Sequence, residues 1–287
     1  MNHKLVQIGL RVPDVDAYVE HVVSTLGVAV TAREDDGRVA LALPGQSPCL
    51  VLTQDAEAAL NHIGLTTTEA NLAEVTRRAD AAGLATHEGR DFGTLRLYTP
   101  NRLAVELRVA EDEARSTTRD GVGPLIGSLD HVSLNASDLD GTVAFFIDVL
   151  GFRLSDSVGT VRHWLRCGPT HHDVAVFSGE DRLQHYAFET HDLNELGHLG
   201  DLLALRGQNF LWGPGRHALG ANIFTYHLDP AGAILEVTTG MIDVGDEEAW
   251  VTQVWSPDTP ASAVMWGPYP PADFRTTSIA IHDHGER

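Results

Sequence analysis

The sequence predicts an α+β fold of two tandem domains, each built from two βαβββ modules that curl around a shared cavity. The main observation is a repeat, because Leu5–Val28 aligns without a gap to Leu129–Phe152. Each copy predicts a strand, an Asp-containing turn, an amphipathic helix and a closing Leu-Gly pair. A second observation is that a strand–helix–strands pattern starts near residues 5, 60, 129 and 183. With 287 residues, 43% hydrophobic and 21% charged, the chain has enough material for packed cores.

The repeat continues along both halves of the chain. Leu60–Thr67 matches Leu183–Thr190, and Leu97–Val109 matches His227–Thr239. Each opening strand and helix is followed by short β-rich runs bounded by turn residues. These runs include Val39–Leu43, Cys49–Leu52, Val161–Arg166 and Val174–Phe177. Four βαβββ modules are therefore the simplest interpretation of the pattern.

The composition also predicts where the domains end. We expect an N-terminal domain at residues 1–110, a linker at 111–127 and a C-terminal catalytic domain at 128–240. The predicted linker is polar, charged and punctuated by glycine and proline. The tail at 241–287 is rich in proline, tryptophan and acidic residues, and we expect it to pack on the body or on a neighbouring subunit. Its last residues, 282–287, are expected to be loose.

Charge and cysteine usage exclude several classes of function. A formal net charge of −20, from 40 acidic and 20 basic residues, repels polyanions, so neither nucleic acid nor a membrane is an expected partner. The two cysteines, Cys49 and Cys167, lie far apart and form no disulfide or zinc motif. There is no apolar signal core and no apolar run near 18 residues, so a cytoplasmic protein is expected.

Three ionisable residues lie inside apolar stretches that predict strands: His131, His185 and Glu236. Burying such a side chain without a partner costs several kcal/mol. One shared metal ion would give all three a partner, and two imidazoles with one carboxylate form the facial triad of non-haem Fe(II) oxygenases. Strand alternation predicts that Leu129, His131 and Ser133 share the face that points into the cavity.

The equivalent positions of the first half carry Gln7, His62 and Glu106. A neutral amide is a poor donor for a divalent transition metal compared with an imidazole. We therefore expect the first site to hold no working metal. Local hydrogen bonds would satisfy the remaining polar side chains.

At these residues the chain resembles the type I extradiol catechol (2,3-)dioxygenases of the vicinal oxygen chelate superfamily. The resemblance covers roughly residues 1–240 and is most specific from Leu129 to Thr239. It implies the vicinal oxygen chelate, or glyoxalase-like, fold. It also implies Fe(II), with Mn(II) as the possible substitute, held by His131, His185 and Glu236 in the C-terminal domain alone.

The resemblance further implies three catalytic residues. His172, in the segment THHDVAV, matches the acid–base histidine of the family. His217 and Tyr226 stand 19 and 10 residues before Glu236, at the family's spacing, and would hydrogen-bond the substrate oxygens. With an ordinary pKa of about 6.5, His172 would exchange a proton at neutral pH.

Three further positions are predicted to line the substrate pocket. Trp164 matches a wall residue of some relatives, and Asn222 lies in the stretch that leads to the glutamate ligand. Relatives that act on carboxylate-bearing catechols carry arginine near the position of Trp212. An indole there predicts an uncharged, apolar substituent, while the tail could supply other substrate contacts.

The resemblance implies extradiol cleavage of a catechol ring with insertion of both atoms of dioxygen. The expected partners are therefore a catechol and dioxygen, in a homo-oligomer of four or more subunits. Two alternatives stay open at this point. One is an enzyme of the same superfamily with a non-catecholic substrate, and the other is a metal-independent protein that binds a planar aromatic ligand. Metal dependence and oxygen consumption would distinguish them.

Overall fold

The computed structural model describes residues 3–90, 92–110, 124, 126–245, 250–258 and 264–285. The order strand, helix, three strands occurs four times along this chain. The first half contains β1 (Lys4–Val12), α1 (Val15–Leu26), β2 (Ala29–Arg33), β3 (Val39–Ala42) and β4 (Pro48–Gln54), then β5 (Ala59–Thr67), α2 (Glu69–Ala81), β6 (His87–Glu88), β7 (Leu95–Tyr98) and β8 (Ala104–Val109).

The second half repeats this order. It contains β9 (Ile126–Ala136), α3 (Leu139–Ala144), a π-helical turn η1 (Phe145–Val149), β10 (Arg153–Val158), β11 (Arg162–Arg166) and β12 (Val174–Ser178), then β13 (Arg182–Thr190), α4 (Leu193–Leu205), β14 (Trp212–Arg216), β15 (Ile223–Leu228) and β16 (Ile234–Thr239). Of the predicted linker, residues 111–123 and 125 lie outside the described residues, and β9 already begins at Ile126.

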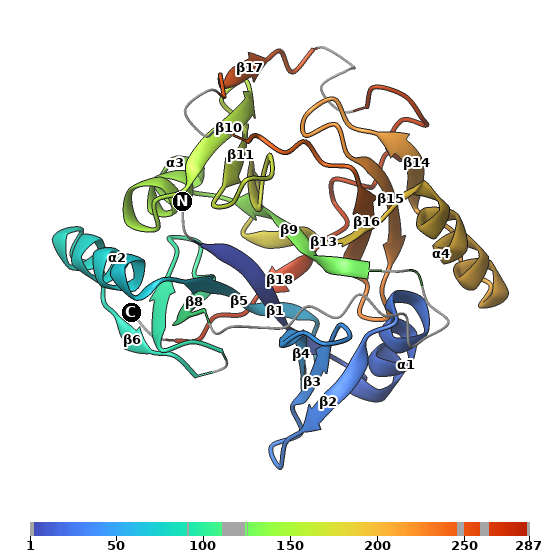
Figure 1. Ribbon diagram of the computed structural model, residues 1–287, viewed down its shortest axis with the longest axis horizontal. Coiled ribbons are helices and arrows are strands. Elements are labelled where there is room, and N and C mark those ends of the chain that lie inside the picture. The colour runs from blue at the N-terminus through green and yellow to red at the C-terminus, as the bar shows by residue number, and fades with distance from the viewer. Residues whose placement is uncertain are drawn as a thin grey trace.

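Strand pairing follows one rule in all four modules. The first strand of each module pairs in parallel with its last strand, as in β1 with β4 and β9 with β12. The first strands of two consecutive modules pair antiparallel, β1 with β5 and β9 with β13. Figure 1 shows the helices on the outside of these sheets. The predicted α+β fold of paired βαβββ modules is confirmed.

The aspartates of the predicted turns begin the helices. Asp14 accepts a hydrogen bond from the backbone N–H of Ala17, and Asp138 accepts one from Gly141. Each carboxylate thereby satisfies a donor that the first helical turn leaves unpaired. Gly27 ends α1 with a φ of 68°, a left-handed conformation that glycine adopts without steric strain.

A buried polar cluster joins the two halves. The Tyr18 hydroxyl of α1 lies 2.6 Å from that of Tyr186 on β13, and both hydroxyls donate to Asp229 Oδ2, at 2.7 and 3.0 Å. Burial and the Asp229 carboxylate raise the pKa of both tyrosines well above the usual 10.0. Both hydroxyls therefore remain protonated and able to donate at neutral pH.

The tail packs along the body and adds two strands, β17 (Gln253–Trp255) and β18 (Ile279–Ile281). Strand β17 pairs with β10, whereas β18 lies between β13 of the second half and β5 of the first. The expectation of a loose end is wrong for residues 282–285. The backbone N–H of His282 donates to Leu60 O at 2.8 Å, and His284 Nε2 lies 2.8 Å from Asn61 O.

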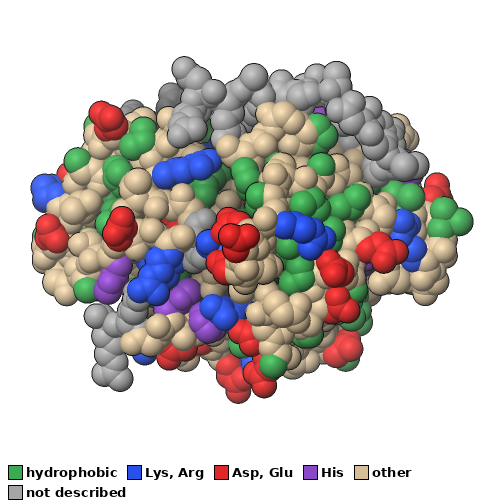
Figure 2. All heavy atoms as spheres, turned by 90° about the horizontal axis from the view of Figure 1, so that it is seen from below, with side chains coloured by type: hydrophobic (Ala, Val, Ile, Leu, Met, Phe, Trp, Pro, Cys, Tyr) green, Lys and Arg blue, Asp and Glu red, His purple; other side chains and the backbone are tan. Residues whose placement is uncertain are grey.

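The surface agrees with an acidic protein. Figure 2 shows Asp and Glu side chains spread over one face, with Lys and Arg between them and no broad basic field. The longest described helices, α2 and α4, have 13 residues each, and no helix in the described ranges is long and apolar enough to cross a bilayer.

Candidate metal centre and pocket

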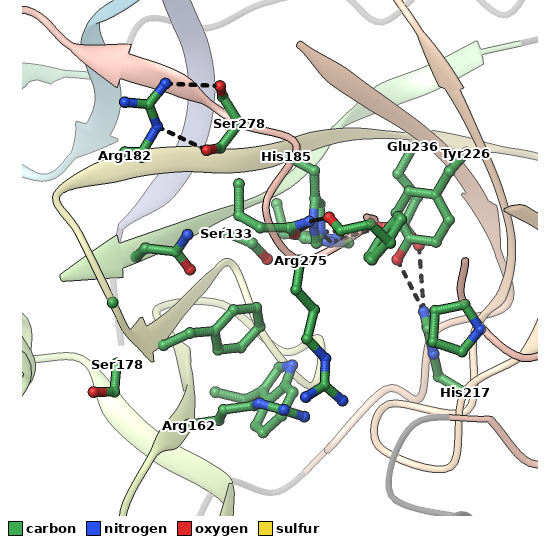
Figure 3. A pocket seen from close by; sticks show the side chains of 18 of the residues that line it. Ser133, Arg162, Ser178, Arg182, His185, His217, Tyr226, Glu236, Arg275 and Ser278 are labelled. Atoms are coloured by element: carbon green, nitrogen blue, oxygen red, sulfur yellow. Dashed lines mark hydrogen bonds and ion pairs between the residues drawn. The ribbon is translucent and has the colours of Figure 1, made fainter. Parts of the chain in front are cut away.

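A pocket of about 740 Å³ opens within the second half. Strands β9 and β11–β16 line it together with the tail, and Figure 3 shows their side chains pointing into one space. All nine residues that the sequence singles out line this pocket: His131, Trp164, His172, His185, Trp212, His217, Asn222, Tyr226 and Glu236.

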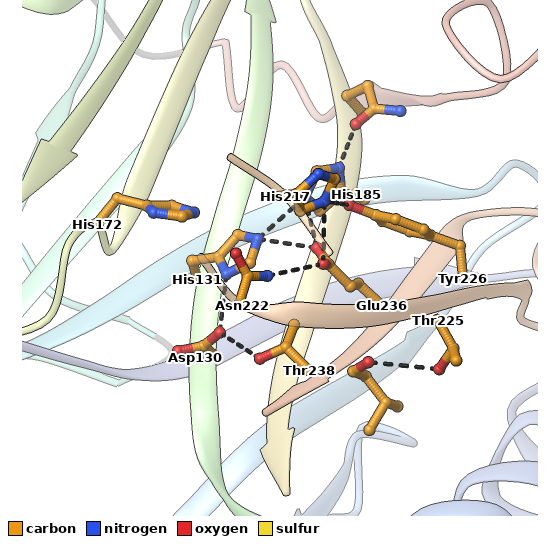
Figure 4. A network of polar contacts seen from close by, with 12 residues as sticks. Asp130, His131, His172, His185, His217, Asn222, Thr225, Tyr226, Glu236 and Thr238 are labelled. Carbon is orange, nitrogen blue, oxygen red and sulfur yellow. Dashed lines mark hydrogen bonds and ion pairs between the residues drawn. The ribbon is translucent and has the colours of Figure 1, made fainter. Parts of the chain in front are cut away.

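Three candidate ligand atoms form a nearly equilateral triangle in the lining of this pocket, and Figure 4 shows the side chains of His131, His185 and Glu236 turned toward one another. His131 Nε2 and His185 Nε2 are 3.1 Å apart. Glu236 Oε2 lies 3.0 Å from His131 Nε2 and 3.1 Å from His185 Nε2. Within the described residues, this is the cluster of His, Cys, Asp and Glu side chains that could hold a metal ion.

The size of the triangle suits one face of an octahedron. Ligand atoms about 2.1 Å from an ion at neighbouring octahedral corners lie about 3.0 Å apart, whereas a tetrahedral arrangement separates them by about 3.4 Å. Glu236 Oε2 is buried and has no hydrogen-bond partner among the described residues. A buried carboxylate oxygen that faces two imidazole nitrogens fits a divalent cation.

A β-bulge aims the first histidine. Strand β9 pairs Ala187 with His131 and Phe188 with Leu129, so Asp130 is an extra residue in the ladder. Leu129 consequently packs in the hydrophobic core, while His131 lines the pocket. The prediction that these two side chains share a face is wrong, because the bulge shifts the alternation by one residue.

The residue before each histidine ligand fixes its ring. Asp130 Oδ2 lies 3.0 Å from His131 Nδ1 and accepts a hydrogen bond from Thr238. Gln184 Oε1 contacts His185 Nδ1 in the same way, next to a second irregularity in the ladder. With Nδ1 engaged, each ring presents Nε2 to the centre. Sequence reasoning missed both neighbours, although the repeated pattern Leu-polar-His was visible.

Asn222 orients the carboxylate of the candidate metal centre. Its side-chain amide donates to Glu236 Oε1 at 3.3 Å, so Oε2 is the oxygen left toward the imidazoles. Burial would raise the pKa of Glu236, but His131 and the other histidines nearby hold it well below the usual 4.5. The ligand is therefore an anion at neutral pH.

In the first half, hydrogen bonds engage the side chains at the positions equivalent to the triad. His62 Nε2 lies 2.9 Å from Gln7 Oε1, and Gln7 Nε2 donates to Pro48 O at 2.9 Å. Asn61 Nδ2 lies 3.2 Å from His62 Nδ1, so an amide nitrogen faces this ring, whereas an amide oxygen, Gln184 Oε1, faces His185 Nδ1 in the second half. The side-chain amide of Gln7 thus lies beside His62 in the first half, where His131 lies beside His185 in the second half.

Glu106 is also fully engaged. Its carboxylate accepts hydrogen bonds from the backbone N–H groups of Arg90, Phe92 and Gly93, and its Oε1 lies 2.6 Å from Arg96 Nε. These partners account for a buried charge without a metal ion.

His172 lies beside the triad but is not part of it. Its ring centre is 4.5 Å from that of His131, and its Nδ1 is 3.0 Å from His171 Nδ1. Burial and the nearby histidines lower the pKa of His172 well below 6.5. The expectation of an ordinary pKa is therefore wrong, because the side chain is buried among imidazoles, and His172 is neutral at pH 7.

His217 and Tyr226 form the opposite wall. His217 Nε2 lies 3.0 Å from Tyr226 Oη and 3.8 Å from Glu236 Oε1. Burial and the Glu236 charge raise the pKa of Tyr226 well above 10.0, which keeps its hydroxyl protonated. The Trp212 ring stacks on Tyr226, with centres 5.1 Å apart, and donates its indole N–H to Pro268 O at 2.7 Å.

Comparisons with known proteins agree with this geometry. Residues 128–237 match the family model described as Glyoxalase/Bleomycin resistance protein/Dioxygenase superfamily. Metapyrocatechase 2 of Cupriavidus necator is 33% identical over 149 residues, which is 51% of this chain and 46% of that protein. This chain thus covers about half of that relative's length. Biphenyl-2,3-diol 1,2-dioxygenase of Paraburkholderia xenovorans (strain LB400) is 27% identical over 285 residues, 91% of this chain and 93% of that protein.

Solved structures give a similar result. The Mn(II)-bound glyoxalase from Novosphingobium aromaticivorans superposes with a TM-score of 0.81 at 25% identity, covering 94% of this chain and 95% of that one. Homoprotocatechuate 2,3-dioxygenase from Arthrobacter globiformis superposes with a TM-score of 0.87 at 24% identity, covering 98% and 92%. The second likeness concerns the fold alone.

Proposed function

Because residues 128–237 belong to the Glyoxalase/Bleomycin resistance protein/Dioxygenase superfamily, we propose that this protein is an extradiol dioxygenase that cleaves a catechol ring beside its two hydroxyls. The observation that carries the proposal is the triangle of two imidazole nitrogens and one carboxylate oxygen inside a pocket. Relatives whose names specify a catechol or a diol dioxygenase support the choice of substrate class.

His131, His185 and Glu236 would hold Fe(II), and the nitrogen and oxygen donors also accept Mn(II). The ion would supply Lewis-acid chemistry, which lowers the pKa of a catechol hydroxyl. Three protein ligands leave room for these small molecules on the pocket side.

His172 would handle the proton. It is neutral, its Nδ1 faces His171, and Nε2 is the nitrogen that remains for the substrate. We assign to it the proton that leaves a substrate hydroxyl, which it returns to a product oxygen later in the reaction. A positioned acid–base group of this kind contributes on the order of 10²–10⁴ in rate.

Tyr226 and His217 would stabilise negative charge on the substrate oxygens. The Tyr226 hydroxyl stays protonated and therefore donates, and His217 Nε2 lies close enough to orient it. Donors that are fixed before the reaction stabilise developing charge without reorganisation. Trp164 and Trp212 supply flat walls for an aromatic ring.

A second candidate is a non-catecholic reaction of the same superfamily. It is favoured by the likeness to the Mn(II)-bound glyoxalase. The triad argues for the dioxygenase, since three ligands suffice for a facial site, and the described residues offer no fourth His, Cys, Asp or Glu atom to the cluster. A metal-independent binding protein would have no use for two buried imidazole nitrogens and a buried carboxylate oxygen that face one another.

The test is oxygen uptake together with visible absorbance. Protein loaded anaerobically with Fe(II) is mixed with a panel of catechols, with Glu236→Gln as the matched variant. We expect one dioxygen consumed per catechol and a yellow product from the unmodified protein, and loss of both iron and turnover from the variant. Iron binding without uptake for any catechol would favour the second candidate. Ligand binding after chelation, without uptake, would favour a binding protein.

We further propose a cytoplasmic homo-oligomer of four or more subunits. Cys49 and Cys167 are buried free thiols, which suits a reducing compartment. The tail exposes large apolar side chains at Val251, Val254 and Tyr269, which suit a subunit contact. Light scattering coupled to gel filtration tests this, and a monomeric mass would refute it.

A further inference from the structure

The pocket contains three arginines, although the chain carries a net charge of −20. Arg182 has a structural partner, because its Nε donates to Ser278 Oγ at 2.8 Å and its Nη2 to Ser278 O at 3.0 Å. It thereby ties the tail to β13. The other two, Arg162 and Arg275, need a different explanation.

Arg162 comes from strand β11 and is held over an aromatic ring. It pairs across the strands with Phe177, and its guanidinium lies 5.9 Å from the centre of that ring. Trp164, two residues along the same strand, points to the same side and packs on Phe177 at 5.4 Å. Arg162 is half-buried, and none of the described carboxylates lies within ion-pair distance of it.

Arg275 comes from the tail, next to an anchored residue. Phe274 is buried against Trp212 and Tyr226, with ring centres 4.8 and 4.9 Å apart. The backbone carbonyl of Phe274 also accepts a hydrogen bond from Gln184. These contacts hold the backbone of Arg275 at the pocket, where its side chain is free of any described ion pair.

The two guanidinium groups face each other. Figure 3 shows the side chains of Arg162 and Arg275 pointing toward one another inside the pocket, away from the labelled triad residues. Burial and the charge of Arg275 lower the pKa of Arg162. Arg162 is half-buried and Arg275 is exposed, and an anion between the two groups would offset the repulsion of their like charges.

We propose that Arg162 and Arg275 form a subsite for a carboxylate on the side chain of the aromatic substrate. The proposal rests on the proposed function, since the hydroxyls would lie at the triad and the ring against Trp164, which also lines the pocket. Guanidinium groups bind a carboxylate in a planar, bidentate manner that an amide or an ester does not match.

This inference departs from the sequence argument at Trp212, which favours an uncharged substituent. Trp212 is a single position on β14, whereas the arginines come from β11 and from the tail. A positive subsite also explains how an anion enters a protein whose overall charge repels it, because charge inside a cleft acts at short range.

The first test is binding, independent of turnover. Phenylacetate and phenylacetamide are titrated into the full-length protein under argon, with tryptophan fluorescence as the signal. We expect phenylacetate to bind roughly tenfold to a hundredfold more tightly than its amide. Arg162→Gln and Arg275→Gln should each remove most of that preference. Arg33→Gln, an exposed arginine on β2, is the matched control and should retain it.

The second test is turnover with Fe(II) and dioxygen, using catechols that carry a carboxymethyl group and their primary amides. Loss of selectivity in the two pocket variants, with the amide still cleaved, supports the subsite. Equal affinity of both probes for the unmodified protein overturns it, and oxygen uptake with a neutral catechol would then leave the proposed function intact. Tight, arginine-dependent phenylacetate binding with no uptake from any catechol keeps the subsite and refutes the dioxygenase.

Discussion

At the scale of single residues, the side chain before each histidine ligand decides what that histidine can do. Asp130 and Gln184 each face the Nδ1 of the next residue and leave Nε2 for the centre. In the first half, the amide nitrogen of Asn61 faces His62 Nδ1, and the amide oxygen of Gln7 faces His62 Nε2. Gln7 in place of the first histidine, together with Arg96 beside Glu106, therefore gives a hydrogen-bonded arrangement in the first half.

The orienting role of Asp130 predicts weaker metal binding when its carboxylate is removed. Asp130→Ala should lower Fe(II) affinity by about 10–100-fold, because His131 loses the contact that fixes its ring. Competition with a chromophoric chelator measures this affinity. Asp16→Ala, an exposed carboxylate on α1, is the control. Equal affinities for the two variants would show that the bulge alone aims His131.

His172 should affect the reaction and not the metal. We expect His172→Asn to lower turnover by roughly 10²–10⁴ while iron content stays at the level of the unmodified protein, because the side chain contacts the triad without providing a ligand. Steady-state oxygen uptake and iron analysis of the same preparation measure both quantities. A variant that lost its iron would place His172 among the ligands.

At the scale of elements, β18 connects the two halves and the pocket. It pairs with β13, which carries His185, and with β5 of the first half. The preceding residue, Ser278, holds Arg182, and the turn before it carries Arg275. A strand of three residues thus positions the tail segment that lines one side of the pocket.

Breaking β18 should destabilise the whole chain. Ala280→Pro removes a backbone donor from a strand that is paired on both sides, which should lower the free energy of unfolding by about 2 kcal/mol or more. Urea unfolding measures this, with Ala280→Ser as the control that keeps the donor. If both variants unfold at the same urea concentration, the strand contributes little to the joint between halves.

At the scale of the whole molecule, the halves also meet at two buried histidines. The rings of His21 on α1 and His227 on β15 are 5.6 Å apart, and neither nitrogen of His227 has a hydrogen-bond partner among the described residues. Burial lowers the pKa of His21 to about 4 and that of His227 to about 3. Both rings are therefore neutral in the folded protein at pH 7.

This pair predicts a pH-dependent stability. Protonation below the unfolded pKa of about 6.5 favours the unfolded chain, so the stability present above pH 6.5 is lost as the pH falls toward 4. His227→Leu should retain about 2 kcal/mol more of its neutral-pH stability at pH 5 than the unmodified protein does. Urea unfolding at pH 8 and pH 5 measures the difference, with exposed His191→Gln as the control. If the unmodified protein and both variants lose the same free energy of unfolding between pH 8 and pH 5, the role of His227 is contradicted.

The four modules and the nine residues that line the pocket could be predicted from the amino-acid sequence. The reason is that strands and helices impose local periods, and the repeat presented each pattern more than once. His131, His185 and Glu236 were visible because charge inside an apolar strand requires a partner. Leu129 was placed on the wrong face, since a bulge inserts a residue without any change in composition.

Only the tertiary structure decided how the tail completes the pocket. Arg182 and Ser278 are 96 positions apart, and Arg275 faces Arg162 from a segment that has no periodic pattern. Such contacts depend on packing between distant surfaces, which a local sequence pattern does not encode. The three side chains of the candidate metal centre were thus predictable from the chain, whereas the position of Arg275 at the pocket depends on where the tail docks.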